Sequence, residues 1–269
     1  MKEFLGIGGY TRTPEGYMSW QHLTFVTSLM LIMIGLAVFL GLRNRKKDDK
    51  TKNIALIVCA ISINVFEIFK IVVLCIRAQD PWNWLYVLPL FLCSIQLITI
   101  PLAAFAKGRI RESSLDFVFI FGILGAVLGT YGAGQNYGAY PVLSLDNVVS
   151  GITHSISGFA SLYIAFSGMA SMKKKNIPIS FSILIGFCIA AYIANIALDY
   201  NYMFLMRGDG TPYDIFFNMV NGNPVLYPLV VVLLFILYIS VFYLIYISIQ
   251  KKKAKSVQIE EKELAMTLS

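Results

Sequence analysis

Strongly polar side chains interrupt the apolar stretches of this sequence, and three of them can carry out chemistry. His154 stands among serines and glycines, and an imidazole there can accept a proton or bind a substrate. Asp199 is the carboxylate best suited to orient such a histidine and to stabilise its charged form. Cys93 supplies a thiol that can act as a nucleophile. Because polar groups are costly at membrane depth, each of them needs a partner or a wet cavity.

Other polar residues in or beside the apolar stretches are candidates for binding a substrate. They are His22, Glu67, Lys70, Gln96, Asn195 and Arg207. A purely structural explanation stays open for each. Glu67 and Lys70 are three residues apart, where a helix lets them neutralise each other. The amides are also explained by hydrogen bonds between helices, and Cys93 by the filling of a small apolar space.

The elements that must position these residues are long apolar segments. About 20 helical residues cross the ~30 Å hydrocarbon core of a bilayer. The sequence therefore predicts an all-α, polytopic membrane bundle in one domain, residues 1–250, followed by a polar tail, 251–269. We expect seven transmembrane helices: Trp20–Leu42, Asn53–Ile76, Trp84–Ala106, Leu115–Tyr131, Asn147–Met169, Pro178–Tyr200 and Pro224–Ile249.

Small residues and prolines refine this expectation. Gly122, Gly125 and Gly129 in the fourth segment allow a neighbouring helix to approach closely. The fifth segment is rich in serine and glycine, so we place these two helices in the middle of the bundle. Pro89 and Pro101 should bend the third helix and free backbone carbonyls near its middle.

The distribution of lysine and arginine predicts the orientation. The first, third and fifth connections and the start of the tail are basic, whereas the even connections are nearly neutral. By the positive-inside rule, the N-terminus lies outside and the C-terminus in the cytoplasm. His154 then lies ~10 Å below the outer boundary, with Glu67 and Cys93 nearer the midplane. We expect these groups to line a cavity in the outer half of the bundle.

Composition excludes several classes of function. The chain is 57% hydrophobic and only 14% charged, unlike a soluble domain. The net charge of +7 belongs to short loops suited to anionic lipids rather than to nucleic acid. The first nineteen residues lack the pattern of a removable signal peptide. The four cysteines lie within apolar segments, and no metal-binding cluster, nucleotide motif or cofactor site is apparent.

A resemblance adds to this reading. The segment Leu88–Cys93, His154 and above all the string Asn201–Leu205 (NYMFL) resemble the YwaF family of bacterial integral membrane proteins, and His22, Glu67 and Lys70 also fit its pattern. The resemblance implies a multi-pass protein of the bacterial plasma membrane and adds Asn201 to the substrate-binding candidates.

The YwaF family is similar to a eukaryotic seven-span group that includes a lipid acyltransferase using a cysteine and a histidine. At the positions matching that cysteine and the histidine after it, this sequence has Leu90 and Phe91. The resemblance therefore carries over only the position of His154.

These observations support a leading hypothesis and two alternatives. The first is a membrane-lipid acyltransferase with His154 as general base, Asp199 as its orienter, and Gln96 or Asn195 donating hydrogen bonds to a developing oxyanion. The second is a non-enzymatic transporter or a receptor for a lipid or small molecule that uses the same cavity. The third is a scaffold whose polar residues only join helices. Membrane lipids are the expected partners, and the oligomeric state is left open.

Overall fold

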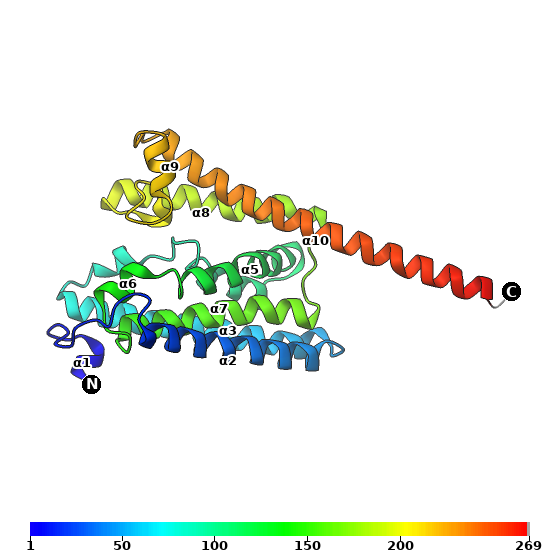
Figure 1. Ribbon diagram of the computed structural model, residues 1–269, viewed down its shortest axis with the longest axis horizontal. Helices are drawn as coiled ribbons and strands as arrows, with labels where there is room; N and C mark the ends of the chain where they lie inside the picture. Colours follow the sequence, from blue (N-terminus) through cyan, green and yellow to red (C-terminus); the bar gives the residue numbers. More distant parts are fainter. Residues whose placement is uncertain (268–269) are drawn as a thin grey trace.

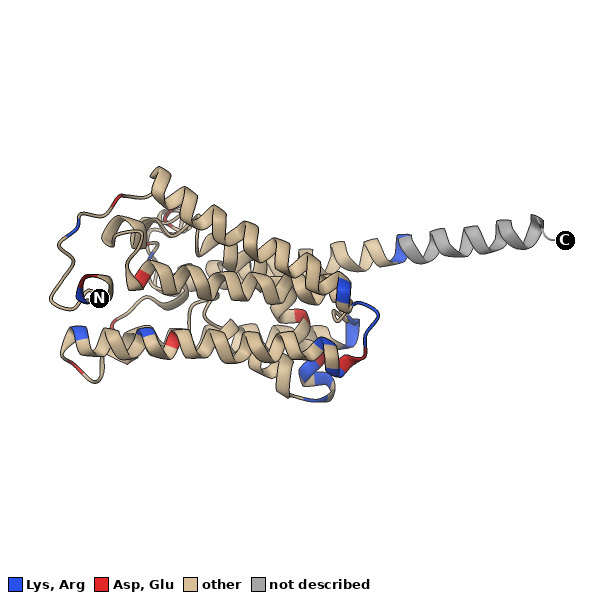
Figure 2. Ribbon diagram, turned by 90° about the horizontal axis from the view of Figure 1, so that it is seen from below, with Lys and Arg blue, Asp and Glu red and all other residues tan. Residues whose placement is uncertain are grey.

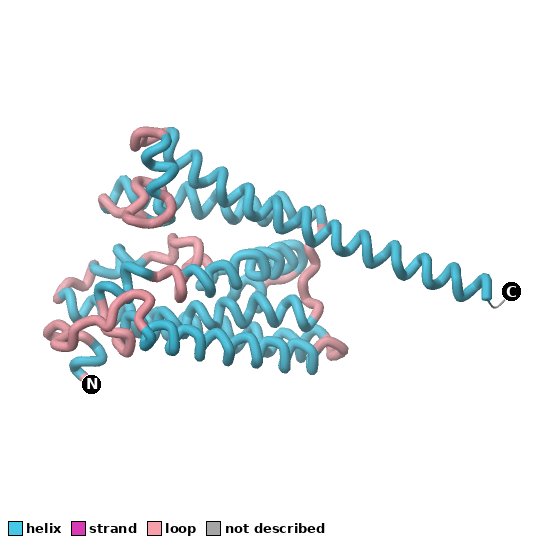
Figure 3. The backbone as a smooth tube through the Cα atoms, viewed as in Figure 1, coloured by secondary structure: helices cyan, strands magenta, loops and turns pink. Residues whose placement is uncertain are grey.

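The computed structural model describes residues 1–267, in which helices and connecting loops make up the whole structure (Figures 1 and 3). The helices, in chain order, are α1 (Lys2–Leu5), α2 (Trp20–Asn44), α3 (Asp49–Ala78), η1 (Asn83–Val87), α4 (Gln96–Phe105), α5 (Gly108–Leu128), α6 (Gly134–Ala139), α7 (Leu145–Ser167), η2 (Lys174–Asn176), α8 (Ile177–Leu198), η3 (Tyr202–Phe204), α9 (Asp214–Met219) and α10 (Leu226–Thr267).

Helix α7 is the centre of the bundle, packed against α2, α3 and α5. Small residues make this possible. A Cβ atom on Gly122 of α5 would lie 2.6 Å from the carbonyl oxygen of Ser157, and one on Gly158 of α7 would lie 2.7 Å from the Cβ of Ala126. The two backbones are therefore close enough to exclude larger side chains. The predicted central position of these two helices is confirmed.

Helices α8 and α10 form a second layer, seen above the α2, α3 and α7 group in Figure 1. An aromatic and aliphatic cluster joins this layer to α5, and it includes Phe121, Leu184, Tyr202, Tyr227 and Phe235. The backbone of α10 continues as one helix from Leu226 to Thr267, and the division at residue 251 stays a prediction.

The prediction of one bent helix over Trp84–Ala106 is wrong. Only η1 and α4 are helical, and the chain between Leu88 and Ile95 is irregular. Pro89 cannot donate a helical hydrogen bond, and it disfavours helical geometry in the residue before it. Pro101, by contrast, is accommodated inside α4. This unwound segment carries Cys93.

Within the described residues, five helices are long and apolar enough to cross a membrane: α2, α3, α7, α8 and α10. Helix α4 is apolar but has only 10 residues, and α5 begins with charged residues. Figure 2 shows most lysines and arginines at the end of the bundle opposite the N-terminus. This is a multi-pass membrane architecture, in which the number of crossings and their direction stay predictions.

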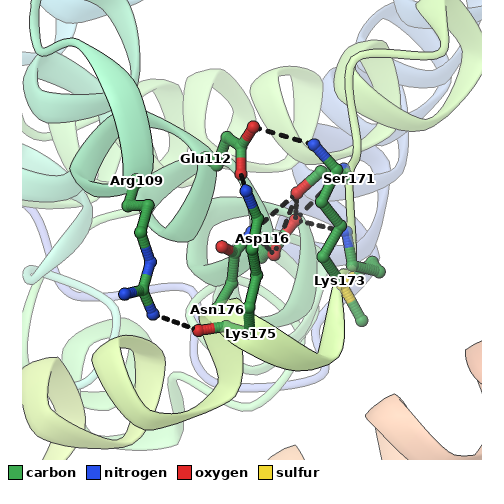
Figure 4. Close-up of polar contacts among 8 residues, drawn as sticks. Arg109, Glu112, Asp116, Ser171, Lys173, Lys175 and Asn176 are labelled. Atoms are coloured by element: carbon green, nitrogen blue, oxygen red, sulfur yellow. Dashed lines mark hydrogen bonds and ion pairs between the residues drawn. The ribbon is translucent and has the colours of Figure 1, made fainter.

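The loop between α7 and α8 is fastened by Asp116 of α5 (Figure 4). This carboxylate is fully buried. It accepts hydrogen bonds from the backbone N–H groups of Ser171 and Met172 (3.2 and 2.8 Å), the hydroxyl of Ser171 and the amide of Asn176 (3.1 Å). These bonds balance the cost of burying the charge and fix the second layer relative to α5.

Candidate functional site

Four of the predicted site residues meet at one small cavity. Glu67 and Lys70 come from α3, Cys93 from the unwound segment and His154 from α7. The cavity measures about 40 Å³, which is enough for a few water molecules but not for a whole lipid molecule. Its remaining lining residues are Ile63, Ser94, Leu97, Ser150, Thr153 and Ser157.

The hydrogen bond of His154 sets its proton distribution. Its Nδ1 lies 2.7 Å from the backbone carbonyl oxygen of Ser150. A carbonyl oxygen can only accept, so Nδ1 must carry the hydrogen, and in the neutral ring Nε2 holds the free lone pair. Among the described residues, the buried Nε2 has no hydrogen-bond partner. It is therefore left free to accept a proton.

Two glycines, Gly125 in α5 and Gly129 at its C-terminal cap, lie against the reactive side chains. A Cβ atom on Gly129 would lie 1.9 Å from both Nε2 and Cδ2 of His154, and one on Gly125 would lie 3.4 Å from the Cβ of Cys93. The two glycines are one helical turn apart. Cys93 and His154 consequently lie side by side against one face of α5.

The thiol of Cys93 and the imidazole of His154 line the same cavity. In the described structure no hydrogen bond joins them, as is common before a substrate binds. A thiol beside an imidazole is the arrangement that activates a cysteine nucleophile.

Tyr202 holds the segment that carries Cys93. Its hydroxyl donates to the carbonyl oxygen of Leu85 (2.6 Å) and accepts from the N–H of Leu88 (3.1 Å). Asn195 in turn binds both the N–H and the carbonyl oxygen of Tyr202, at 2.6 and 3.0 Å. Sequence reasoning singled out the NYMFL string but missed this role of its tyrosine.

Glu67 and Lys70 form an ion pair of 2.6 Å on α3, with both side chains mostly buried. This is the neutralising pair that the spacing allows. Because both residues also line the cavity, they supply its fixed charges.

The remaining predicted site residues lie elsewhere. Asp199 is an exposed residue at the C-terminal cap of α8. The hydrogen bond that was predicted from Asp199 to His154 is made instead by the backbone carbonyl of Ser150. His22 is fully buried and joins the N–H of Met18 to the carbonyl oxygen of Thr130. The side chain of Gln96 accepts a hydrogen bond from Thr99 at 3.0 Å and does not line the cavity.

Asn201 and Arg207 belong to the loop between α8 and α9. Asn201 donates to the carbonyl oxygen of Arg207 and to the carboxylate of Asp209, at 2.8 and 2.7 Å. Its own oxygen accepts from the N–H of Met206. These bonds stabilise a turn in which Met203 and Phe204 both have a φ of 55°, a costly conformation for such residues. Asn195 and Asn201 thus shape the loop rather than the cavity.

A second polar cluster, missed by sequence reasoning, joins the ends of α3 and α7. Arg77 pairs with Asp146 at 2.8 Å, and the hydroxyl of Tyr10 donates to the same carboxylate oxygen at 2.7 Å. Asp146 lies two helical turns before His154. The N-terminal segment that carries Tyr10 is therefore held at the N-terminal end of α7, about two helical turns from the cavity residue His154. Among the described residues, no group of three or more His, Cys, Asp or Glu side chains is arranged to hold a metal ion.

Comparison with known families gives one match. Searches of curated proteins and of solved structures find none. The model of the TMEM164 family matches residues 17–246, which include α2 to α9, the first half of α10 and every residue that lines the cavity. The resemblance to the YwaF family specifically is not confirmed. The chain belongs to the TMEM164 family of membrane proteins.

Proposed function

We propose that this protein transfers acyl groups between membrane lipids, with Cys93 as nucleophile and His154 as general base. One observation carries the proposal: His154, whose tautomer is fixed by Ser150 and whose buried Nε2 has no hydrogen-bond partner among the described residues, lines the same cavity as Cys93. Ser150 thus replaces Asp199 as the residue that orients His154, and Cys93 takes the role of nucleophile.

In the first half-reaction, Nε2 of His154 takes the thiol proton and the Cys93 sulfur attacks the carbonyl carbon of a lipid ester. The resulting tetrahedral intermediate collapses as the ester C–O bond breaks. His154 returns the proton to the departing lipid oxygen, which leaves as an alcohol. The acyl group remains on Cys93 as a thioester.

In the second half-reaction, His154 removes a proton from the hydroxyl of an acceptor lipid. The acceptor oxygen attacks the thioester carbonyl, the C–S bond breaks, and the proton passes to the sulfur of Cys93. Lys70 is the cation of the cavity and stabilises the negative charge that develops on the carbonyl oxygen in both halves. Glu67 positions Lys70 through their ion pair.

The proposal requires the acyl ester to reach membrane depth. We propose seven crossings, formed by the five long helices together with α5 and with the unwound segment joined to α4. The basic loops then face the cytoplasm, and the site lies in the outer half of a bacterial plasma membrane. An unwound segment at that depth is acceptable because it is enclosed by protein and borders a cavity.

The test compares lipid profiles of cells lacking the protein and complemented with wild type, Cys93→Ser or His154→Gln at equal expression. Cys188→Ser is the control, because Cys188 is a buried free cysteine that lies outside the cavity. We expect one lipid species to follow wild type and the control but neither site variant.

A clickable fatty acyl phospholipid supplies a second readout on purified protein. It should label wild type with a hydroxylamine-sensitive bond that Cys93→Ser abolishes. Identical lipid profiles and no labelling would refute the transferase. If the purified protein nevertheless bound the unchanged lipid, the non-enzymatic alternative would replace it.

A further inference from the structure

A second, larger hollow lies on the other side of α7 from the loop that carries Cys93. It is a groove between α2 and α3, both of which pack on α7, and its volume is about 610 Å³. That volume is typical of sites that hold a ligand. Its lining is largely apolar and includes Leu29, Leu36, Val58, Phe66, Ile156 and Phe159.

The groove has the length of one lipid tail. On α2 it extends from Leu29 to Asn44, and fifteen residues of helix span ~22 Å. One leaflet occupies ~15 Å, half of the hydrocarbon core. A single extended acyl chain therefore fits within the groove along its axis.

The two ends of the groove differ in polarity. Leu29, Phe66 and Ile152 form an apolar end, whereas Asn44 and Thr51 form a polar one. The polar end adjoins the turn between α2 and α3, and cations are concentrated in this turn and in the helix ends on either side of it. They are Arg43, Arg45, Lys46, Lys47, Lys50 and Lys52.

These cations are available to a ligand. Among the described residues, none of the six forms an ion pair with a carboxylate. Asp48, the acidic residue before α3, is engaged in capping that helix through Thr51. An apolar groove that ends at unneutralised cations complements a molecule with a long tail and an anionic head.

We infer that this groove binds an anionic phospholipid, with one acyl chain between α2 and α3 and its phosphate against the 43–52 turn. The occupant belongs to the leaflet on the basic side of the protein. This site is separate from the Cys93–His154 cavity and does not depend on any reaction there.

Val58 and Ile61 provide a matched pair of variants on α3. Both side chains are 56% exposed, but only Val58 lines the groove. The protein is purified in mild detergent, exposed to equimolar phosphatidylglycerol and phosphatidylcholine of identical chains, and analysed by native mass spectrometry. We expect Val58→Trp to lower the retained phosphatidylglycerol at least fivefold and Ile61→Trp to leave it unchanged.

A second pair of variants tests the head group. Changing Arg45, Lys46 and Lys47 to glutamine should abolish the preference for phosphatidylglycerol over phosphatidylcholine. Changing Lys174, Lys251 and Lys252 to glutamine, which removes the same amount of charge elsewhere, should leave this preference unchanged. Equal retention by Val58→Trp and Ile61→Trp, or equal effects of the two charge variants, would overturn the inference. So would a change in oligomeric mass without a change in retained lipid, since the groove would then be an interface between copies.

Discussion

Gly129 and His154 are in such close contact that a single methyl group cannot fit between them: a Cβ on Gly129 would lie 1.9 Å from Nε2 of the imidazole. The atom that would be displaced is the one proposed to accept the proton. The glycine is thus as necessary to the site as the histidine.

Gly129→Ala should therefore abolish acyl transfer, because the imidazole must rotate away from the cavity. We expect an overpacking cost of roughly 1–3 kcal/mol, measured as a lower thermal unfolding temperature in detergent. Gly186→Ala is the control, since a Cβ at Gly186 meets no atom within 4 Å. Full activity of Gly129→Ala would mean that Nε2 is not the base.

Tyr202→Phe should loosen the segment that carries Cys93. It removes the hydrogen bonds to Leu85 and Leu88 and costs about 1–2 kcal/mol. In a variant that keeps Cys93 as its single cysteine, we expect faster alkylation of the thiol and slower acyl transfer.

The control for Tyr202→Phe is Tyr227→Phe. Tyr227 is also buried, and among the described residues its hydroxyl has no hydrogen-bond partner. If both variants changed the alkylation rate equally, the hydrogen bonds of Tyr202 would have no specific role in holding the Cys93 segment.

Asp116→Ala should destabilise the protein by about 3 kcal/mol, because charge-assisted hydrogen bonds to the α7–α8 loop are lost. Glu112→Gln on the same helix should cost under ~1 kcal/mol, since its partners Lys173 and Lys175 are half exposed. Thermal unfolding of both variants measures the difference. Equal losses would contradict the assignment of Asp116 as the main anchor of this loop.

The Tyr10–Asp146 bond predicts a pH dependence. Burial, and then the hydrogen bond to Asp146, raise the pKa of Tyr10 to about 12. Because this value lies above the ordinary ~10 of tyrosine, the stabilisation by the neutral phenol is complete below pH ~10 and is lost as pH rises through the folded pKa.

Unfolding of wild type and Tyr10→Phe, measured across this range, tests the dependence on pH. The stability advantage of wild type should be constant near neutral pH and shrink above pH ~10. An advantage that did not change up to the folded pKa would exclude the Tyr10 phenol as its source.

The sequence by itself determined the class of protein. Apolar length predicted membrane helices because hydrocarbon thickness sets a minimum span, and small residues placed α5 and α7 together because only they permit close backbone contact. The same reasoning marked His154, Cys93, Glu67 and Lys70 as costly groups that need a shared polar site.

Only the tertiary structure decided which of these groups meet. Apolar length predicted one bent helix where the chain unwinds. It could not show that Tyr202 replaces the lost helical hydrogen bonds from more than a hundred residues away. Depth suggested Asp199 as the partner of His154, but depth does not fix which helices are neighbours. The backbone carbonyl of Ser150, one turn before His154, accepts the hydrogen bond instead. The sequence could not predict this bond, because every helical residue has a backbone carbonyl.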